Sequence, residues 1–482
     1  MNFRSFPQRR AATALLLLAL LVGMAACTAV GPDHHPLDYP APRQWHTSLD
    51  GGRQNAGDPA GHLARWWESF QDPVLVELVR QGAAGSLELA QARARVREAR
   101  ARRGLGDSDL FPDLTGVAAA RRSQNAGGPA ASLFSTGFDA GWEIDVFGGL
   151  RRGVEAAQGD LEAAQAGLDG VRVTLAAEIG LNYIEARTYQ ARLAAAEGNL
   201  EVQRQTFDLV HSRHQAGLGD ELDLQQARYN LESTRSQIPA LHSGLAAACH
   251  RLAVLAGRPP GAIQDLMAPA RPVPAAPPAV AVGIPAETLR RRPDILQAER
   301  QVAAQSARIG VAQADAYPRF RLAGSVGLNA FNSNDLFQWA SRTWGIGPSL
   351  SWNLFDAGAT RRQIQVQTAV QERLAAAWEA AVLTALEEVE NALNTYAQEQ
   401  VRRDHLAAAL AAARQAEALA ARKYQAGLAD FASVLEAQRA LLSFQDQMAA
   451  SQGAVSINLV KLYKALGGGW EPRLAEDSPP PS

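Results

Sequence analysis

Cysteine and methionine are scarce in this chain, and each scarcity excludes a class of chemistry. The 482 residues include two cysteines and four methionines. If processing removes the segment before Cys27 and modifies that residue, only Cys249 keeps a free thiol, so no disulfide can form within the chain. An Ala-rich helical pattern surrounds Cys249, which indicates a buried small side chain rather than a reactive thiol. The four methionines give little support to a thioether relay for copper.

Catalytic and nucleotide-binding motifs are also missing. The sequence has no HExxH, no GxSxG and no P-loop pattern. His211 and His214 could share one helix face, but no acidic or cysteine ligands join them, so we predict no metal site. Removal of residues 1–26, with their three arginines and no acidic residue, changes the formal net charge from −2 to −5. That balance is not typical of a nucleic-acid-binding protein. We therefore expect no enzyme activity, no cofactor and no nucleic-acid partner.

Residues 1–26 have the pattern of a bacterial export signal. Three arginines precede a short apolar core over residues 14–22, and two alanines follow at residues 25–26. Cys27 comes next, as in a bacterial lipobox, although Met24 stands where that motif usually has leucine. We predict a signal peptide over 1–26 and a diacylglycerol and acyl lipid on Cys27; a plain signal peptide with an incidental cysteine is the alternative. Thr28 is not acidic, which favours the outer membrane for a lipoprotein.

The two halves of the chain repeat one pattern. Residues 215–220 (QAGLGD) return 210 positions later as residues 425–430 (QAGLAD), and Phe111-Pro112 returns 206 positions later as Tyr317-Pro318. Each copy is too long for a solenoid unit, so we predict two structural repeats of one architecture. The first repeat spans 61–257 and the second 286–467. A Pro-rich linker (258–285) separates them, a lipidated extended segment (27–60) precedes them, and a tail (468–482) follows.

Apolar and polar residues alternate in four short segments, which predicts four β-strands. These segments are 114–122 and 136–147 in the first repeat, and 319–331 and 343–355 in the second. After the signal, no segment approaches the roughly 20 apolar residues of a transmembrane helix, but the four segments have lengths that suit tilted transmembrane strands. Pro348 predicts a bulge in the last strand. A soluble sheet packed on helices is the alternative.

Long helices are predicted around these strands. A helix over 86–104 and another over 293–310 precede the strand pairs, and helical hairpins over 150–256 and 360–466 follow them. The first arm of each hairpin has no proline and reaches roughly 100 Å, a length that only a coiled-coil-like assembly can bury. Gly217 and Gly427 suit helix-ending positions. Pro239 should break or kink the second arm of the first hairpin.

Four strands cannot close a barrel, and lipid does not tolerate an open sheet edge. A chain whose four strands span a membrane must therefore associate with further copies. The expected fold is mainly α with a transmembrane β-barrel portion that continues into a long helical tube. The physics of the strands and helices leaves the number of chains open.

Five stretches together resemble the TolC-like outer-membrane factors, specifically the OprM/NodT-type lipoprotein branch that partners resistance–nodulation–division pumps. They cover nearly the whole mature chain: residues 30–45, 291–299, Gly358 with Arg361, 387–393 and 424–439. The resemblance implies a homotrimer with a twelve-stranded barrel in the outer membrane of a Gram-negative bacterium and a helical tube in the periplasm. It also implies a passive exit duct for small molecules, which a periplasmic adaptor and an inner-membrane pump deliver.

The resemblance also implies a pore gate at the start of the last helix. Glu436 stands where the family commonly has a gate aspartate, Ser433 where some members have an acidic residue, and Ala432 where a bulky aliphatic residue often narrows the pore. Three Glu436 carboxylates near one axis would favour the passage of cations. A solvated helix glutamate with no such role is the alternative.

The hairpin turns are implied to form the periplasmic tip that meets the adaptor. This tip includes Gly217, Gly427, Asp220 and Asp430. Asp223 and Tyr424 match positions that tie closed helices together in some relatives, whereas Ala429 replaces the arginine expected there.

Three other functions remain open on the sequence alone: a periplasmic adaptor or scaffold lipoprotein, the exit duct of a different secretion pump, and an envelope hydrolase. The first of these needs no alternating strands and no duplication of a whole strand–helix half. The third needs a convergent polar pocket, which the sequence does not indicate.

Overall fold

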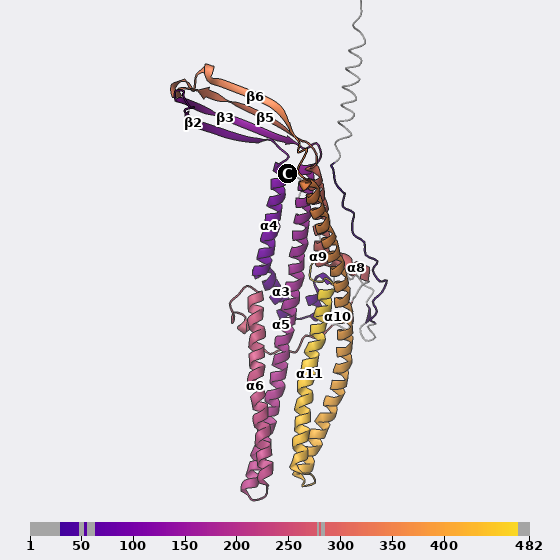
Figure 1. Ribbon diagram of the computed structural model, residues 1–482. Helices are drawn as coiled ribbons and strands as arrows, with labels where there is room; N and C mark the ends of the chain where they lie inside the picture. Colours follow the sequence, from indigo (N-terminus) through magenta and orange to yellow (C-terminus); the bar gives the residue numbers. More distant parts are fainter. Residues whose placement is uncertain (1–28, 48–52, 55–62, 277–278, 281–284, 471–482) are drawn as a thin grey trace, which may run out of the picture. The chain divides into compact units, whose positions relative to one another are not determined.

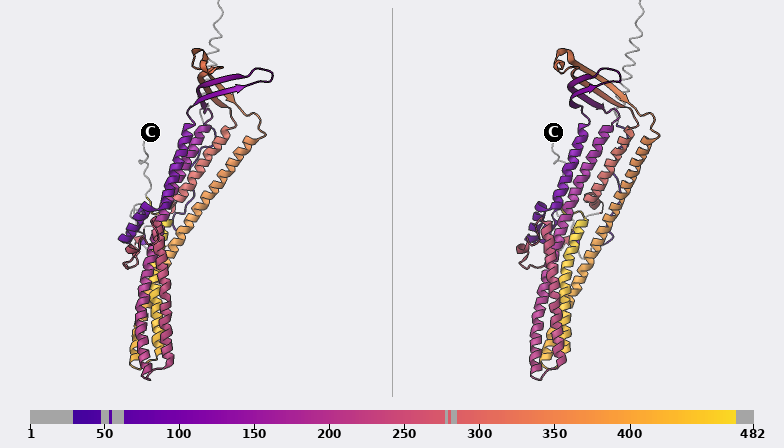
Figure 2. Two further views of the ribbon diagram at one scale, coloured as in Figure 1. Left: turned by 90° about the vertical axis from the view of Figure 1, so that its left-hand side faces the viewer. Right: turned by 60° about the vertical axis from the view of Figure 1, so that its left-hand side comes forward.

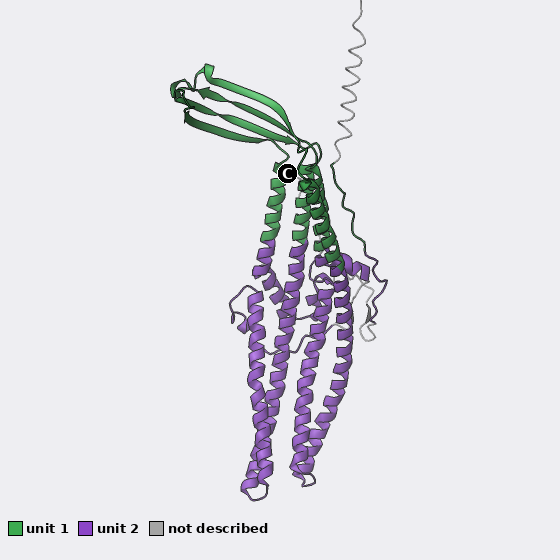
Figure 3. Cartoon of the chain, in the orientation of Figure 1, with its two compact units in different colours: residues 1–38, 94–165, 297–379 green, residues 39–93, 166–296, 380–482 purple. Residues whose placement is uncertain are grey.

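The computed structural model describes residues 29–47, 53–54, 63–276, 279–280 and 285–470. The chain divides into two compact units (Figure 3). Unit 1 contains residues 1–38, 94–165 and 297–379, and unit 2 contains residues 39–93, 166–296 and 380–482. The predicted signal peptide and its lipidation site, Cys27, lie outside the described residues.

Unit 1 contains an antiparallel sheet of four strands in the order β2-β3-β5-β6 (Figure 1). These strands are β2 (Asp113–Ser123), β3 (Ala131–Ile144), β5 (Arg319–Ala330) and β6 (Arg342–Ser351). Phe138 lies opposite Val326, which in turn lies opposite Trp344. Because side chains alternate between the two faces of a sheet, these three share one face. They are 57%, 59% and 79% exposed, so the apolar face of this sheet has no cover within the described chain.

The strand ends differ from the sequence prediction. β3 begins at Ala131 rather than at 136 and ends at Ile144 rather than at 147, while β6 ends at Ser351 rather than at 355. β3 and β6 end early because an aspartate after each strand accepts a backbone N–H from the first turn of the next helix. Asp145 Oδ2 accepts the backbone N–H of Arg151 at 2.9 Å, and Asp356 Oδ2 accepts that of Thr360 at 2.8 Å.

The bulge predicted at Pro348 is wrong. The register between β5 and β6 is continuous from Arg319 opposite Ser351 to Leu328 opposite Arg342, with Pro348 opposite Leu322. β6 is an edge strand of this sheet, and an edge strand accommodates a residue without an N–H when that position faces away from its neighbour.

Four helices contribute to unit 1: α4 (Leu87–Ser108), the first part of α5 (Gly149–Gln215), α9 (Pro293–Ala314) and the first part of α10 (Ala359–Gln425). α4 and α9 continue four residues beyond their predicted ends at 104 and 310. Polar contacts tie the helices together within the unit. Arg300 pairs with Glu162 at 3.2 Å, and Gln305 Nε2 donates to Gln367 O at 3.0 Å.

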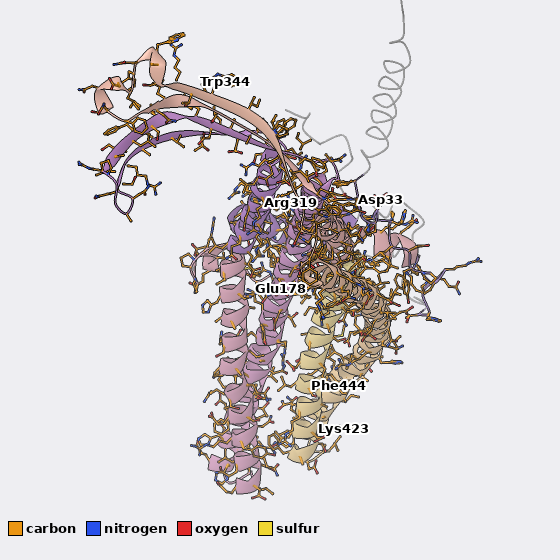
Figure 4. The ribbon with its side chains drawn as sticks, turned by 45° about the horizontal axis from the view of Figure 1, so that its top comes forward. Asp33, Glu178, Arg319, Trp344, Lys423 and Phe444 are labelled. Carbon is orange, nitrogen blue, oxygen red and sulfur yellow. The ribbon has the colours of Figure 1, made fainter. Side chains whose placement is uncertain are left out.

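The N-terminal segment lies along unit 1 without helix or strand over residues 29–38. The backbone N–H of Val30 donates to Phe147 O at 3.0 Å. Arg152, whose side chain is almost fully buried, donates to Asp33 Oδ1 at 2.7 Å and to Val30 O at 3.1 Å. Over residues 29–47, the prediction of an extended lead-in is confirmed. Asp33 of this segment is labelled in Figure 4.

Unit 2 contains two helical hairpins, one formed by α5 and α6 (Glu221–Leu255) and one by α10 and α11 (Phe431–Ala465). α5 and α10 have 67 residues each, and α6 and α11 have 35 each. Both hairpin turns lie at the same end of the unit (Figures 1 and 2). The core between the helices includes the fully buried side chains of Trp66, Tyr183 and Tyr396. Pro239 does not break α6, which continues through it.

Unit 2 also contains several short elements. They are η1 (Trp66–Phe70), α3 (Pro73–Gly85), α7 (Gln264–Met267), α8 (Pro285–Arg291) and a two-residue parallel pair of β1 (Arg53–Gln54) with β4 (Ala279–Val280). The Pro-rich linker is therefore partly ordered. The buried guanidinium of Arg187 donates to Pro269 O at 2.8 Å, and Ser456 Oγ donates to Pro274 O at 2.5 Å, which fixes the linker to the helices.

One described helix, α6, is long and apolar enough by length and composition to cross a membrane. The sequence prediction that no segment after the signal reaches this limit is therefore too strict. The buried residues of α6 include Leu231, Leu241 and Leu252.

Candidate functional site

The two hairpin turns of unit 2 end their first helices with the same backbone geometry. Gly217 and Gly427 have φ of 73° and 72°, the left-handed conformation that glycine adopts at low cost. Leu218 N–H donates to Arg213 O at 2.8 Å, and Leu428 N–H donates to Lys423 O, also at 2.8 Å. This hydrogen-bond pattern is a Schellman motif in both turns. The prediction that both glycines end helices is confirmed.

An aspartate caps the second helix of each hairpin. Asp220 Oδ1 accepts the N–H of Leu222 at 3.2 Å, and Asp430 Oδ1 accepts the N–H of Ser433 at 3.0 Å. The Ser433 hydroxyl also donates to Asp430. A carboxylate at this position satisfies a free N–H of the first turn and interacts favourably with the helix dipole. The predicted gate residue Ser433 thus has a structural role in the cap of α11.

A small apolar cluster joins the two hairpins next to their turns. Its buried side chains come from α5, α6 and α11: Val210, Ala227, Phe431, Val434 and Leu435. Burial of this face leaves the opposite face of α11 exposed. Ala432, Ser433 and Glu436 all lie on that exposed face. The structure therefore brings the three predicted gate residues together, and the Glu436 carboxylate faces solvent in the single chain.

Arg213 places a positive charge beside Tyr424, although Ala429 replaces the arginine expected at position 429. Its guanidinium lies 5.1 Å from the centre of the Tyr424 ring, and the rings of Tyr424 and Phe431 are 5.4 Å apart. Asp223 is partly buried nearby. Burial, together with the charges of Asp220 and Asp430, raises the pKa of the Asp223 carboxyl, and Arg213 partly offsets this rise. Arg213 comes from the first repeat, so a search at position 429 alone could not find it.

A second arginine, Arg439 of α11, also joins the two hairpins. Arg439 Nε donates to Asn230 Oδ1 at 3.2 Å, and its guanidinium lies 4.9 Å from the centre of the Tyr229 ring, to whose hydroxyl it also donates. Arg439 is three residues after Glu436, and residues at this spacing are neighbours on a helix surface. Position 229 is the equivalent of position 439 in the first repeat. The equivalence of positions 229 and 439 in the two repeats is the sequence signal that could have indicated this contact.

The two tip histidines make separate contacts. His214 Nε2 lies 3.2 Å from Glu221 Oε2, while the ring of His211 stacks on Phe207 with centres 5.8 Å apart. Within the described residues, no three His, Cys, Asp or Glu side chains gather in a way that could hold a metal ion. The tip thus carries two arginine contacts, two aspartate caps and the exposed glutamates Glu221 and Glu436.

Comparisons with known proteins agree with this architecture. The family described as Outer membrane efflux protein matches residues 78–258 and 284–468. Nodulation protein T of Rhizobium leguminosarum bv. trifolii is 32% identical over 449 residues, which cover 92% of this chain and 95% of that protein. Pyoverdine export outer membrane protein OpmQ of Pseudomonas putida is 32% identical over 476 residues, which cover 95% of this chain and 97% of that protein.

Solved outer-membrane channels share the fold. The outer-membrane channel OprN is 36% identical with a TM-score of 0.86, covering 92% of this chain and 100% of that chain. The open state of the MtrE outer membrane channel of Neisseria gonorrhoeae is 26% identical with a TM-score of 0.83, covering 92% of this chain and 99% of that chain. These relatives are channel proteins of the outer membrane. The chain belongs to the Outer membrane efflux protein family.

Proposed function

We propose that three copies of this chain form the passive outer-membrane exit duct of a tripartite efflux system. In this assembly, three four-stranded sheets close a twelve-stranded barrel, and the helical hairpins form a tube in the periplasm. A periplasmic adaptor contacts the tip, and an inner-membrane pump of the resistance–nodulation–division type supplies the energy and the cargo. No chemistry on the cargo is required of the duct.

The single observation that carries this proposal is the sheet of unit 1. One of its faces is apolar and exposed at Phe138, Val326 and Trp344, while Asp139, Ser325 and Thr343 lie on the opposite face. β2 and β6 are its edge strands, and a lipid environment requires partners for such edges. Twelve strands are an allowed even number for a membrane barrel, and four are not. In Figure 4, Trp344 is labelled on β6 and Arg319 at the first residue of β5.

The duplication of the chain supports the same assembly. The paired helices have equal lengths in the two halves: 22 residues in α4 and α9, 67 in α5 and α10, and 35 in α6 and α11. The family match also falls into two segments on either side of the linker. Two repeats per chain give a trimer six similar helical hairpins around one axis, which suits a tube.

The lipid on Cys27 would anchor the duct beside its barrel. Cys27 precedes Val30 by three residues, and the N–H of Val30 is bound to Phe147, just after the end of β3. An acyl chain attached there would enter the same bilayer as the strands. Lipid attachment and the barrel would then act together in outer-membrane localisation.

We assign the gate to Glu436, with Ser433 and Ala432 on the same exposed face of α11. The adaptor contact is assigned to the two turns with their caps, Gly217 with Asp220 and Gly427 with Asp430. Asp223 and Tyr424 hold the closed tip through Arg213. The exposed leucines that follow the two turn glycines, Leu218 and Leu428, add apolar contact area at the tip.

Replacement of Glu436 with glutamine should reduce the cation preference of the channel. Three carboxylates near one axis attract cations and repel anions, whereas three amides do neither. Reversal potentials in a planar bilayer under a KCl gradient would measure the change. The matched control is Glu379→Gln, which removes one exposed charge from α10 away from the turns. An unchanged K⁺ to Cl⁻ permeability ratio in Glu436→Gln would count against the gate assignment.

Replacement of Arg213 with methionine should favour the open tip. A cation–π contact contributes about 0.5–2 kcal/mol, so its loss should raise the open-to-closed ratio about 2- to 30-fold per chain. Single-channel recordings would show more frequent or longer openings. Arg204→Met is the control, because Arg204 lies on the same helix and, among the described residues, pairs with the exposed Glu201 and Asp208. Equal open probabilities in the two variants would show that Arg213 does not restrain the tip.

A further inference from the structure

We propose that a polar cavity among α5, α10 and α11 of unit 2 binds one hard divalent cation, Ca²⁺ or Mg²⁺, in each chain. The cavity has a volume of about 230 Å³. Its ten lining residues are Ala194, Ala195, Gly198, Asn199, Val202, Gln203, Glu417, Gln438, Leu441 and Gln445. It lies on the buried side of α11, away from the exposed face that carries Glu436, so it is separate from the proposed gate.

Two of the residues that line this cavity each have a side-chain carbonyl oxygen that is buried without a hydrogen-bond partner. These oxygens are Gln203 Oε1 and Gln438 Oε1, and these side chains are only 3% and 5% exposed. A buried polar atom without a partner costs about 1–3 kcal/mol. Two such atoms in residues that line one cavity therefore favour a ligand that accepts their lone pairs.

The hydrogen bonds around Gln438 fix which end of its amide is free. Thr206 Oγ1 donates its single hydrogen to Val202 O at 2.9 Å. It can therefore only accept in its 3.1 Å contact with Gln438, which identifies the amide nitrogen of Gln438 as the donor. The oxygen of Gln438 is then the unpartnered atom, and a flipped amide would place two acceptors against each other.

A neighbouring amide adds another oxygen. Asn199 Nδ2 donates one hydrogen to Ala195 O at 2.7 Å and the other to Gln445 Oε1. Both of its hydrogens are used, so the remaining capacity of Asn199 is its Oδ1 acceptor. The polar wall of the cavity is thus rich in neutral oxygen ligands.

The charge of the lining selects a cation over an anion. Glu417 is the one charged residue among the ten lining residues, and none of the ten is Lys, Arg or His. Carboxylate and amide oxygens are the ligands that Ca²⁺ and Mg²⁺ prefer, with water completing the coordination shell. Neutral oxygens with a single carboxylate suit a hydrated ion better than a fully dehydrated one.

The amide residues that line this cavity are not repeated in the other half of the chain. At a shift of 210 residues, Gln203 corresponds to Ala413 and Asn199 to Ala409, while Gln438 corresponds to Arg228. The equivalent place in the other half therefore lacks the oxygens and carries a positive charge. We assign one site, not two, to each chain.

Isothermal titration of the purified, EDTA-treated protein in detergent with CaCl₂ or MgCl₂ tests this site. We expect saturable binding of one ion per chain and a higher thermal midpoint with the ion than in EDTA. Glu417→Gln should weaken binding at least about tenfold, which corresponds to about 1.4 kcal/mol. Glu379→Gln, the same change on an exposed part of the same helix, should bind as the wild type does.

Gln203→Leu provides a second test that does not depend on loss of charge. It removes one unpartnered oxygen, so it should fold at least as well as the wild type in EDTA and lose the stabilisation by the ion. Absence of saturable binding by the wild type would overturn the proposal. Equal affinities of wild type and Glu417→Gln would overturn it as well, because the ion would then bind elsewhere.

Discussion

Gly137→Ala should prevent stable assembly of the chain in the outer membrane, whereas Gly347→Ala should be tolerated. A Cβ at position 137 would lie 2.5 Å from Val326 O and 2.7 Å from Gly327 Cα. Both atoms belong to the backbone of β5, which is hydrogen-bonded to β3 at a spacing of about 4.8 Å and cannot retreat without loss of the ladder. Overpacking typically costs about 1–3 kcal/mol and occasionally more, and contact with backbone atoms places this change at the upper end.

Gly347→Ala is a matched control for this change. Both glycines lie on the polar face of the sheet, and a Cβ at position 347 would meet nothing within 4 Å. The amount of oligomer in outer-membrane fractions, compared on gels before and after boiling, would measure assembly. We expect a decrease of about tenfold or more for Gly137→Ala, since each 1.4 kcal/mol corresponds to a factor of ten. Equal amounts for both variants would contradict the β3–β5 register.

Arg292→Met should destabilise unit 2 by about 2–4 kcal/mol, although methionine fills a similar space. Arg292 is 8% exposed and joins three elements. It pairs with Asp294 at 2.6 Å and with Glu388 of α10 at 2.8 Å, and it donates to Ala465 O at the end of α11 at 2.9 Å. The estimate lies below that for a fully buried charge, because the two carboxylates are about half exposed and can regain water.

The thermal midpoint from circular dichroism at 222 nm would measure the effect. Arg290→Met is the control, because Arg290 lies two residues before Arg292, in the short helix α8, and is exposed. It should leave the midpoint close to that of the wild type. If Arg292→Met unfolded at the same temperature as Arg290→Met, the three contacts of Arg292 would contribute nothing to stability.

Much of the fold could be predicted from the sequence because its signals are periodic or local. Apolar residues at every second position located the four strands, and apolar residues at steps of three and four positions located the helical hairpins. Gly217 and Gly427 marked the helix ends because a left-handed residue is needed there. The strand ends were missed at Asp145 and Asp356, although an aspartate before a helix is a recognisable capping signal.

The contacts at the candidate site could not be predicted in the same way. Arg213 meets Tyr424 across 211 positions of sequence, and Arg439 meets Tyr229 across 210. Such pairs depend on how the two hairpins pack, which no local pattern encodes. Pro348 shows the same limit in the sheet: its effect depends on the edge position of β6, which is a property of the whole sheet. The cavity lined by Gln203 and Gln438 arises only when three helices come together.

Single-channel conductance of the purified protein in a planar lipid bilayer tests the central claim that this chain forms a passive exit duct. Wild-type protein and the Arg213→Met variant should be recorded together, so that a closed tip in the wild type is not mistaken for the lack of a pore. We predict discrete conductance steps without any nucleotide or proton gradient, more frequent in Arg213→Met than in the wild type. A bilayer that stays sealed at all voltages with both inserted proteins would contradict the claim.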